Sequence, residues 1–167
     1  HNAVPRTEVT RLRWTPVRDQ SSADRRDLWQ ATRTRLRDHH LQRLNLLLNA
    51  ASQGSALYRR QLGPSPPVLA SCDDLRDLPT TTKAELVTAT EAGEWLAHPE
   101  RTRIRFHHTS GTSGRPLASP DTAEDWSWWV ATWQHTLDAA EIGPGRRALL
   151  AFSFGPFVGF WSAFDAL

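Results

Sequence analysis

The amino-acid sequence predicts a layered α/β protein. Stretches with apolar residues at helical spacing alternate with short strand-like runs, in the order helix, helix, strand, glycine-rich loop, helix, strand, helix. Of the 167 residues, 39% are hydrophobic and eight are tryptophan, so the chain carries enough large apolar side chains to form a core. This composition argues against disorder.

The first helical part follows an irregular, basic arm, which we predict for residues 1–24. Ser21 and Asp24 have the spacing of a capping box, and apolar residues then recur at helical spacing as far as about Ser52. The sequence therefore predicts a mostly helical stretch here. We treat residues 25–167 as one folded but incomplete unit.

Two further short helices are predicted by paired hydroxyl and carboxylate side chains. Ser71 with Asp74, and Thr82 with Glu85, each offer an oxygen to a first-turn amide and a carboxylate in return. The helices should begin close to Cys72 and to the next residue after Thr82.

The second half of the chain predicts two strands, each followed by a helix. Residues 102–108 alternate in character over the length of a strand, and residues 126–140 carry an aromatic and apolar helical stripe. Residues 148–153 read as a short buried apolar strand, and a helix should begin just after Pro156.

The charge distribution is uneven along the chain. The net charge of the whole sequence is +2, but ten arginines against five acids give residues 1–43 a charge of +5. These arginines alternate with Asp and Glu in a helical context, so we interpret them as a solvated face and expect no nucleic-acid partner.

The single cysteine and the histidines limit the other classes of site. Cys72 excludes an internal disulfide or a multi-cysteine zinc site and is compatible with the reducing cytoplasm, where we expect the protein to act. His107 and His108 fall on opposite faces of the predicted strand, so no metal site is predicted from them. The uncharged stretch 148–164 contains Gly-Pro and is shorter than the about 18 to 20 residues of a spanning helix, so no membrane partner is expected.

Residues 107–117, reading HHTSGTSGRPL, have the composition of an anion-binding loop. Glycines let backbone amides approach phosphate oxygens, hydroxyls add donors, and Arg115 adds a positive charge. An ordinary Ser/Gly-rich hairpin loop has a similar composition, so the residues alone are compatible with an anion-binding loop and with an ordinary hairpin loop. The spacing of Gly111 and Gly114 fits neither the nucleotide P-loop nor the dinucleotide fingerprint.

The segment SGTSGRP resembles, position by position, the signature loop of the adenylate-forming superfamily. Two flanking segments narrow the resemblance to phenylacetate-coenzyme A ligases: LPTTTKAEL at residues 78–86 and LYRRQL at residues 57–62. IGPGRR at residues 142–147 is similar to a further family segment, with Arg146 where Asp is usual. Leu117 stands where some relatives have a second lysine.

The resemblance implies an AMP-forming carboxylate-CoA ligase that activates an aryl or acyl carboxylate with ATP and Mg²⁺ and passes it to coenzyme A. It implies the N-terminal part of the large layered α/β domain, with the C-terminal remainder absent and the catalytic residues expected beyond Leu167. A small-molecule carboxylate would be the substrate, and a homodimer is a candidate assembly. The implied phosphate-binding residues are Thr109, Ser110, Gly111, Thr112, Ser113, Gly114 and Arg115.

Phe154, Gly155 and Phe157 are candidates for the acyl or aryl pocket, although the same residues could be plain core. Two alternatives stay open for the chain as a whole. It could be a truncated, non-catalytic nucleotide-binding remnant, since it contains no Met and ends within an apolar run. It could also be a serine hydrolase with Ser153 as nucleophile, but no histidine follows Ser153 in the chain.

Overall fold

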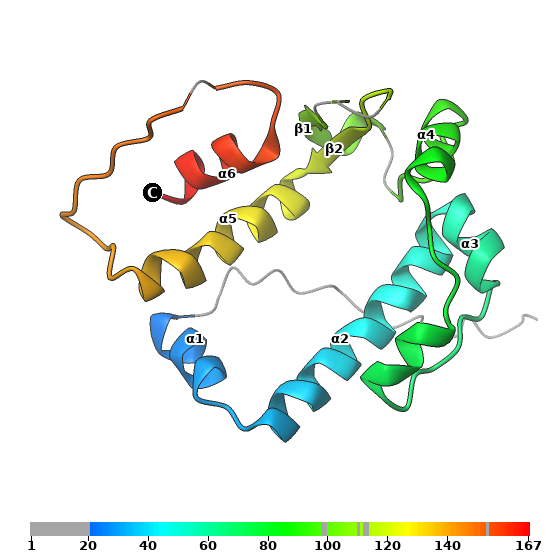
Figure 1. Ribbon diagram of the computed structural model, residues 1–167, viewed down its shortest axis with the longest axis horizontal. Coiled ribbons are helices and arrows are strands. Elements are labelled where there is room, and N and C mark those ends of the chain that lie inside the picture. Colours follow the sequence, from blue (N-terminus) through cyan, green and yellow to red (C-terminus); the bar gives the residue numbers. More distant parts are fainter. Residues whose placement is uncertain (1–20, 98–99, 110, 112–113, 153) are drawn as a thin grey trace, which may run out of the picture.

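The computed structural model describes residues 21–97, 100–109, 111, 114–152 and 154–167. Within these ranges the chain combines α-helices with one two-stranded antiparallel sheet. Figure 1 shows the two strands between helix α5 on one side and helix α4 on the other. The mixture of helices and strands agrees with the predicted α/β class in this coarse sense.

The first two helices confirm the capping signal at Ser21 and the mostly helical character of this part of the chain. Helix α1 (Ser22–Trp29) begins with Ser21 as N-cap, and Asp24 completes the capping box. The mostly helical stretch predicted as far as about Ser52 is confirmed, but it is divided into two helices, because α1 ends at Trp29 and the chain is not helical again until Arg33. The Thr32 side chain accepts a hydrogen bond from the Arg35 amide and starts α2 (Arg33–Gly54).

The next helix and the 3-10 helix after it contact α2. Helix α3 (Ala56–Leu62) lies against α2, and the Ser52 hydroxyl donates to the Gly63 carbonyl at 2.5 Å. The 3-10 helix η2 (Cys72–Asp77) and helix α4 (Lys83–Glu91) both begin with the predicted capping boxes.

A β-hairpin and two helices make up the second half. After the 3-10 turn η3 (Glu100–Thr102), strand β1 (Arg103–His108) pairs antiparallel with β2 (Ala118–Thr122). Helix α5 (Ala123–Ala139) begins directly at the end of β2, with Thr122 as its cap, and packs against α6 (Val158–Ala166). Strand β1 was predicted; β2 was not.

The predicted buried strand at residues 148–153 is wrong for its described part. Residues 148–152 form no strand, and the Leu149 side chain is 90% exposed. A strand needs a neighbour to satisfy its backbone groups, and no strand of the described chain pairs with this segment. No helix within the described ranges combines the length and the apolar character needed to cross a membrane.

Candidate phosphate-binding loop

The glycine-rich segment connects β1 to β2 and is closed at its base by two hydrogen bonds. The Thr109 amide donates to the Leu117 carbonyl at 3.0 Å, and the Leu117 amide donates to Thr109 Oγ1 at 3.0 Å. The hydroxyl of Thr109 therefore accepts within the loop while its own hydrogen can still be donated. The connection is longer than the about two to five residues usual in hairpins.

Gly111 occupies a position that only glycine fits. Its φ of 70° lies in the left-handed region, and the Gly114 amide donates to its carbonyl at 2.9 Å. A Cβ added at Gly111 would lie 2.9 Å from the Gly114 carbonyl oxygen and 3.0 Å from Cγ of Pro116. The loop therefore turns so tightly that no side chain is accommodated at this point.

The positive charge of the loop is paired in this structure. The Nη1 atom of Arg115 donates to Oε1 of Glu91, the last residue of α4. Both side chains are largely exposed, 76% for Arg115 and 58% for Glu91. Of the predicted phosphate-binding residues, Ser110, Thr112 and Ser113 lie outside the described residues.

A buried histidine and aspartate lie behind the loop. His107 Nδ1 and Asp121 Oδ2 are 3.2 Å apart, and the imidazole stacks on the indole of Trp126 with 5.2 Å between ring centroids. His107 is 4% exposed and Asp121 is 7% exposed. Burial raises the pKa of Asp121, and the hydrogen bond with His107 opposes that rise. The pair joins β1 to β2 on the inner face of the hairpin.

A second polar contact fastens β1 to the two helices. Asp165 on α6 accepts from Arg105 Nη2 at 2.9 Å and from Trp126 Nε1 at 2.8 Å. The Arg105 guanidinium lies 4.9 Å from the centre of the Trp126 ring, in the geometry of a cation–π interaction. The strand that leads into the loop is thus held by both α5 and α6.

Comparison with known proteins identifies the relatives of the chain. It is 31% identical to the phenylacetate-coenzyme A ligase of Pseudomonas putida over 127 residues, and 29% identical to that of Aromatoleum evansii over 147 residues. The chain is phenylacetate-coenzyme A ligase-like. These matches cover 74% and 86% of the chain but only 29% and 33% of the two ligases. No family model matches the sequence.

A third relative, the phenylacetate-coenzyme A ligase of Escherichia coli, is 31% identical over 121 residues, which are 71% of this chain and 28% of that protein. The ligase-like chain thus spans about a third of the length of the curated relatives it matches. These matches confirm the resemblance to phenylacetate-coenzyme A ligases that we drew from the loop and its flanking segments.

The predicted pocket residues of this ligase-like chain lie next to the start of the loop. The His108 amide donates to the Pro156 carbonyl at 2.9 Å, which brings the segment between Phe154 and Phe157 to the end of β1. Phe154 packs on Trp161 with ring centroids 4.7 Å apart. The Gly155 carbonyl accepts a hydrogen bond from Trp161 Nε1 at 2.9 Å. The ring of Phe157 lies edge-on to the rings of Phe160 and His108.

Phe154 and Phe157 are each partly exposed, at 44% and 36%, so neither side chain is buried in a core. Ser153, the hypothetical hydrolase nucleophile, lies outside the described residues. The structure therefore places the predicted aromatic segment beside the predicted loop.

A cavity of about 240 Å³ lies along β2. Tyr58 of α3, Trp95 and Arg103 contribute to its wall together with residues 119–122. Arg103 pairs with Thr122 at the end of the hairpin away from the loop, and the cavity wall continues along β2 as far as Ser119. This cavity was not predicted from the sequence, because its wall combines four separate segments.

Proposed function

We propose that the chain is the phosphate-binding part of an AMP-forming carboxylate-CoA ligase. In this proposal the hairpin and its helices belong to the large layered α/β domain of an adenylate-forming enzyme. The observation that carries it is the tightly turned loop at Gly111, which follows a strand and has the signature SGTSGRP. The names of the curated relatives support the ligase reading.

The described loop residues fit a polyphosphate ligand. The absence of a side chain at Gly111 allows the tight turn, and the open space around the Cβ position of Gly114 leaves the backbone there accessible to phosphate oxygens. Thr109 provides a hydroxyl and Arg115 provides a guanidinium, and charge-assisted hydrogen bonds of this kind are stronger than neutral ones. In this proposal the residues from Thr109 to Arg115 bind the β- and γ-phosphates of ATP. Ser110, Thr112 and Ser113 are included because they belong to the signature.

Bound ATP would supply the adenylyl group that the carboxylate takes up, with Mg²⁺ accompanying the nucleotide and coenzyme A as the acceptor. The contribution of this chain is to hold and orient the phosphates as charge shifts onto the departing pyrophosphate. The segment at Phe154, Gly155 and Phe157 would place the aryl or acyl end of the substrate next to the loop, because Pro156 is hydrogen-bonded to His108.

The experiment is carboxylate-dependent exchange between ATP and labelled pyrophosphate in the full-length gene product. We expect Thr109→Ala to lower the exchange rate about tenfold or more, since one charge-assisted hydrogen bond contributes on the order of 1.5 to 3 kcal/mol. Gly111→Val should abolish exchange, because the added side chain would overlap the Gly114 carbonyl.

Matched controls separate the loop from general damage to the fold. Gly143 has open space around its Cβ position and no positive φ, so Gly143→Val should leave exchange nearly unchanged. Thr136 is exposed on α5, and Thr136→Ala should behave similarly. Unchanged exchange in both loop variants would exclude the loop as the phosphate site.

A further inference from the structure

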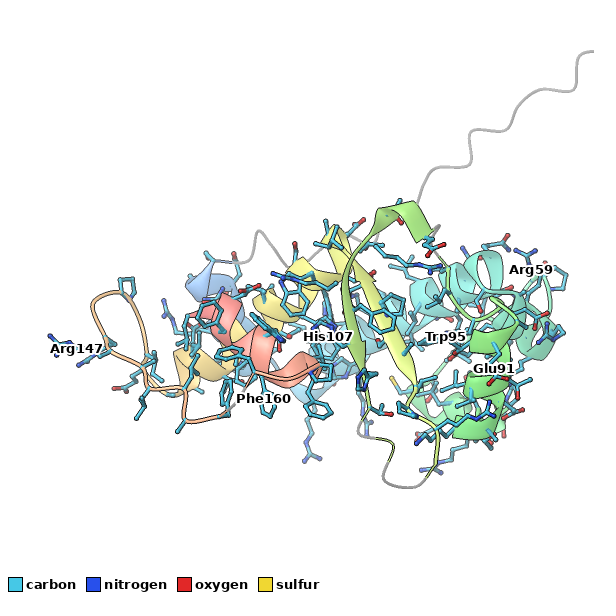
Figure 2. The ribbon with its side chains drawn as sticks, turned by 90° about the horizontal axis from the view of Figure 1, so that it is seen from above. Arg59, Glu91, Trp95, His107, Arg147 and Phe160 are labelled. Carbon is cyan, nitrogen blue, oxygen red and sulfur yellow. The ribbon has the colours of Figure 1, made fainter. Side chains whose placement is uncertain are left out.

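We propose that Glu91 restrains Arg115 and so lowers the affinity of the loop for phosphate until the ion pair is exchanged for the ligand. This inference rests on the proposed function, because it assigns Arg115 to the phosphates. It goes beyond the loop itself by making the end of helix α4 a regulator of the site. Figure 2 shows Glu91 among the helices on the same side of the strands as Arg59.

The position of Glu91 in its helix points to a role outside that helix. Glu91 is the last residue of α4, and the last turn of α4 contains no basic residue. A carboxylate at a helix C-terminus is unfavourable, because the carbonyl end of the helix already carries partial negative charge. Arg115, 24 residues further along the chain, supplies the compensating positive charge.

The pair is suited to exchange because it is exposed. Arg115 is 76% exposed and Glu91 is 58% exposed, and ion pairs in such surroundings are weak. A guanidinium has five N–H donors but one net charge, so the carboxylate and a phosphate compete for it. A triphosphate carries several negative charges close together and would therefore displace a single carboxylate.

The displacement also has a structural consequence. Arg115 follows Gly114 directly, and Gly114 closes the turn at Gly111 through its amide. The ion pair thus connects the phosphate loop to helix α4, whose first residues, Lys83–Leu86, end the LPTTTKAEL segment. Phosphate binding would release this connection, and loss of phosphate would restore it.

The test is the dissociation constant of ATP, measured by titration calorimetry at low ionic strength on the full-length gene product. Glu91→Gln should tighten ATP binding about two- to fivefold, the factor expected for an exposed ion pair. Arg115→Ala should weaken it. In the Arg115→Ala background, Glu91→Gln should have no further effect, because Glu91 acts through Arg115.

Glu94 provides a charge-matched control. Its carboxylate pairs with Arg60 at 2.7 Å, so Glu94→Gln removes the same charge without touching Arg115. Unchanged affinity in Glu94→Gln supports the restraint. Equal tightening in Glu91→Gln and Glu94→Gln, or tightening by Glu91→Gln that persists without Arg115, would overturn it in favour of general charge repulsion.

Two other outcomes separate the restraint from the proposed function. If Thr109→Ala weakens ATP binding but Glu91→Gln leaves it unchanged or weaker, the loop binds phosphate and the restraint is wrong. If ATP binds with the same affinity in the unchanged protein, Thr109→Ala and Arg115→Ala, the loop is not the phosphate site and the proposed function fails.

Discussion

The two halves of the molecule are held together by different interactions. In the helical half, α2 and the segments that follow it are joined by hydrogen bonds from polar side chains to backbone groups. In the hairpin half, aromatic residues between positions 152 and 164 form a cluster, in addition to the polar contacts that Asp165 makes with Arg105 and Trp126. Figure 2 shows the two halves on either side of the strands, with Arg59 and Phe160 labelled far apart.

The helical half depends on a few specific polar contacts. The Asn45 side chain donates to the Leu69 carbonyl at 3.0 Å and accepts from the Leu69 amide at 2.8 Å. Ser55 and Arg59 also bond to backbone carbonyls, those of Glu94 and Ser52. Each contact satisfies a backbone group that has no partner in a regular helix or strand, so each is difficult to replace.

The hairpin half instead spreads its stabilisation over many rings. Phe152 stacks on Phe160 at 4.6 Å between centroids, and both are part of one aromatic cluster. Its other members are Phe154, Phe157, Trp161 and Phe164. Ring contacts are less directional than hydrogen bonds, and the stabilisation is divided among several rings. The comparison predicts that one substitution is more damaging in the helical half.

The largest effect is expected for Asn45→Ala. The substitution removes both hydrogen bonds to Leu69. The backbone amide and carbonyl of Leu69, whose exposed fraction is 5%, then lose the partners that Asn45 provided. We expect the free energy of unfolding to fall by about 3 kcal/mol, measured by urea denaturation. Asn49→Ala, on an exposed position of the same helix, should change it by less than about 0.5 kcal/mol. Equal effects of the two variants would contradict the comparison.

A smaller loss is expected for Phe160→Ala in the aromatic cluster. The ring is only partly buried and its neighbours can close part of the space, so we expect a loss of about 2 kcal/mol in the same measurement. Leu149→Ala, at a side chain that is 90% exposed, is the control and should have almost no effect. If Phe160→Ala lowered the free energy of unfolding more than Asn45→Ala, the hairpin half would be the more sensitive to a single substitution, contrary to the prediction.

The link between helices α1 and α5 gives the next effect. Arg25 Nε donates to Asp138 Oδ2 at 2.5 Å, and this hydrogen bond lowers the pKa of Asp138. The pair therefore stabilises the fold above the ordinary aspartate pKa of about 3.9, and its contribution is lost as the pH falls through the lowered value. Asp138→Asn should be less stable than the unchanged protein at neutral pH.

Thermal unfolding across the acidic range tests this linkage. The difference in unfolding temperature between Asp138→Asn and the unchanged protein should become smaller as the pH falls. Asp73→Asn is the control, because Asp73 and Arg76 form an exposed pair with an N–O distance of 3.6 Å. A difference for Asp138→Asn that does not vary with pH would mean that the ion pair contributes nothing.

The smallest effect is expected for Asp121→Asn. Burial raises the pKa of Asp121, so the folded state holds this proton more tightly than the unfolded state. Stability contributed by this group falls as the pH rises from the ordinary aspartate pKa through the raised value. Over that interval, the free energy of unfolding of Asp121→Asn should rise relative to that of the unchanged protein. A relative fall would mean that the hydrogen bond with His107 outweighs burial.

Local interactions explain what could be predicted from the sequence. The capping pairs at Ser21, Ser71 and Thr82 each join residues three apart, so their identity was enough to place the starts of three helices. Strand β1 and the glycine-rich loop were predicted for the same reason, and Gly111 has the positive φ that such a loop requires. The order of most elements follows from these signals.

The parts that the sequence did not predict depend on distant partners. Strand β2 has the residues ASPDT, of low strand propensity, and Pro120 donates no hydrogen bond; it forms a strand because β1 lies beside it. Residues 148–152 have a better strand composition but no neighbouring strand in the described chain. Pairing, rather than propensity, decided both outcomes.

The candidate site divides in the same way. The sequence by itself determined the loop, its glycine and its family resemblance, since these depend on adjacent residues. Only the tertiary structure decided that Arg115 pairs with Glu91 and that His107 lies against Asp121, because such contacts depend on how separate elements pack. Electrostatic and packing energies depend on distance in space, and separation along the chain does not encode it.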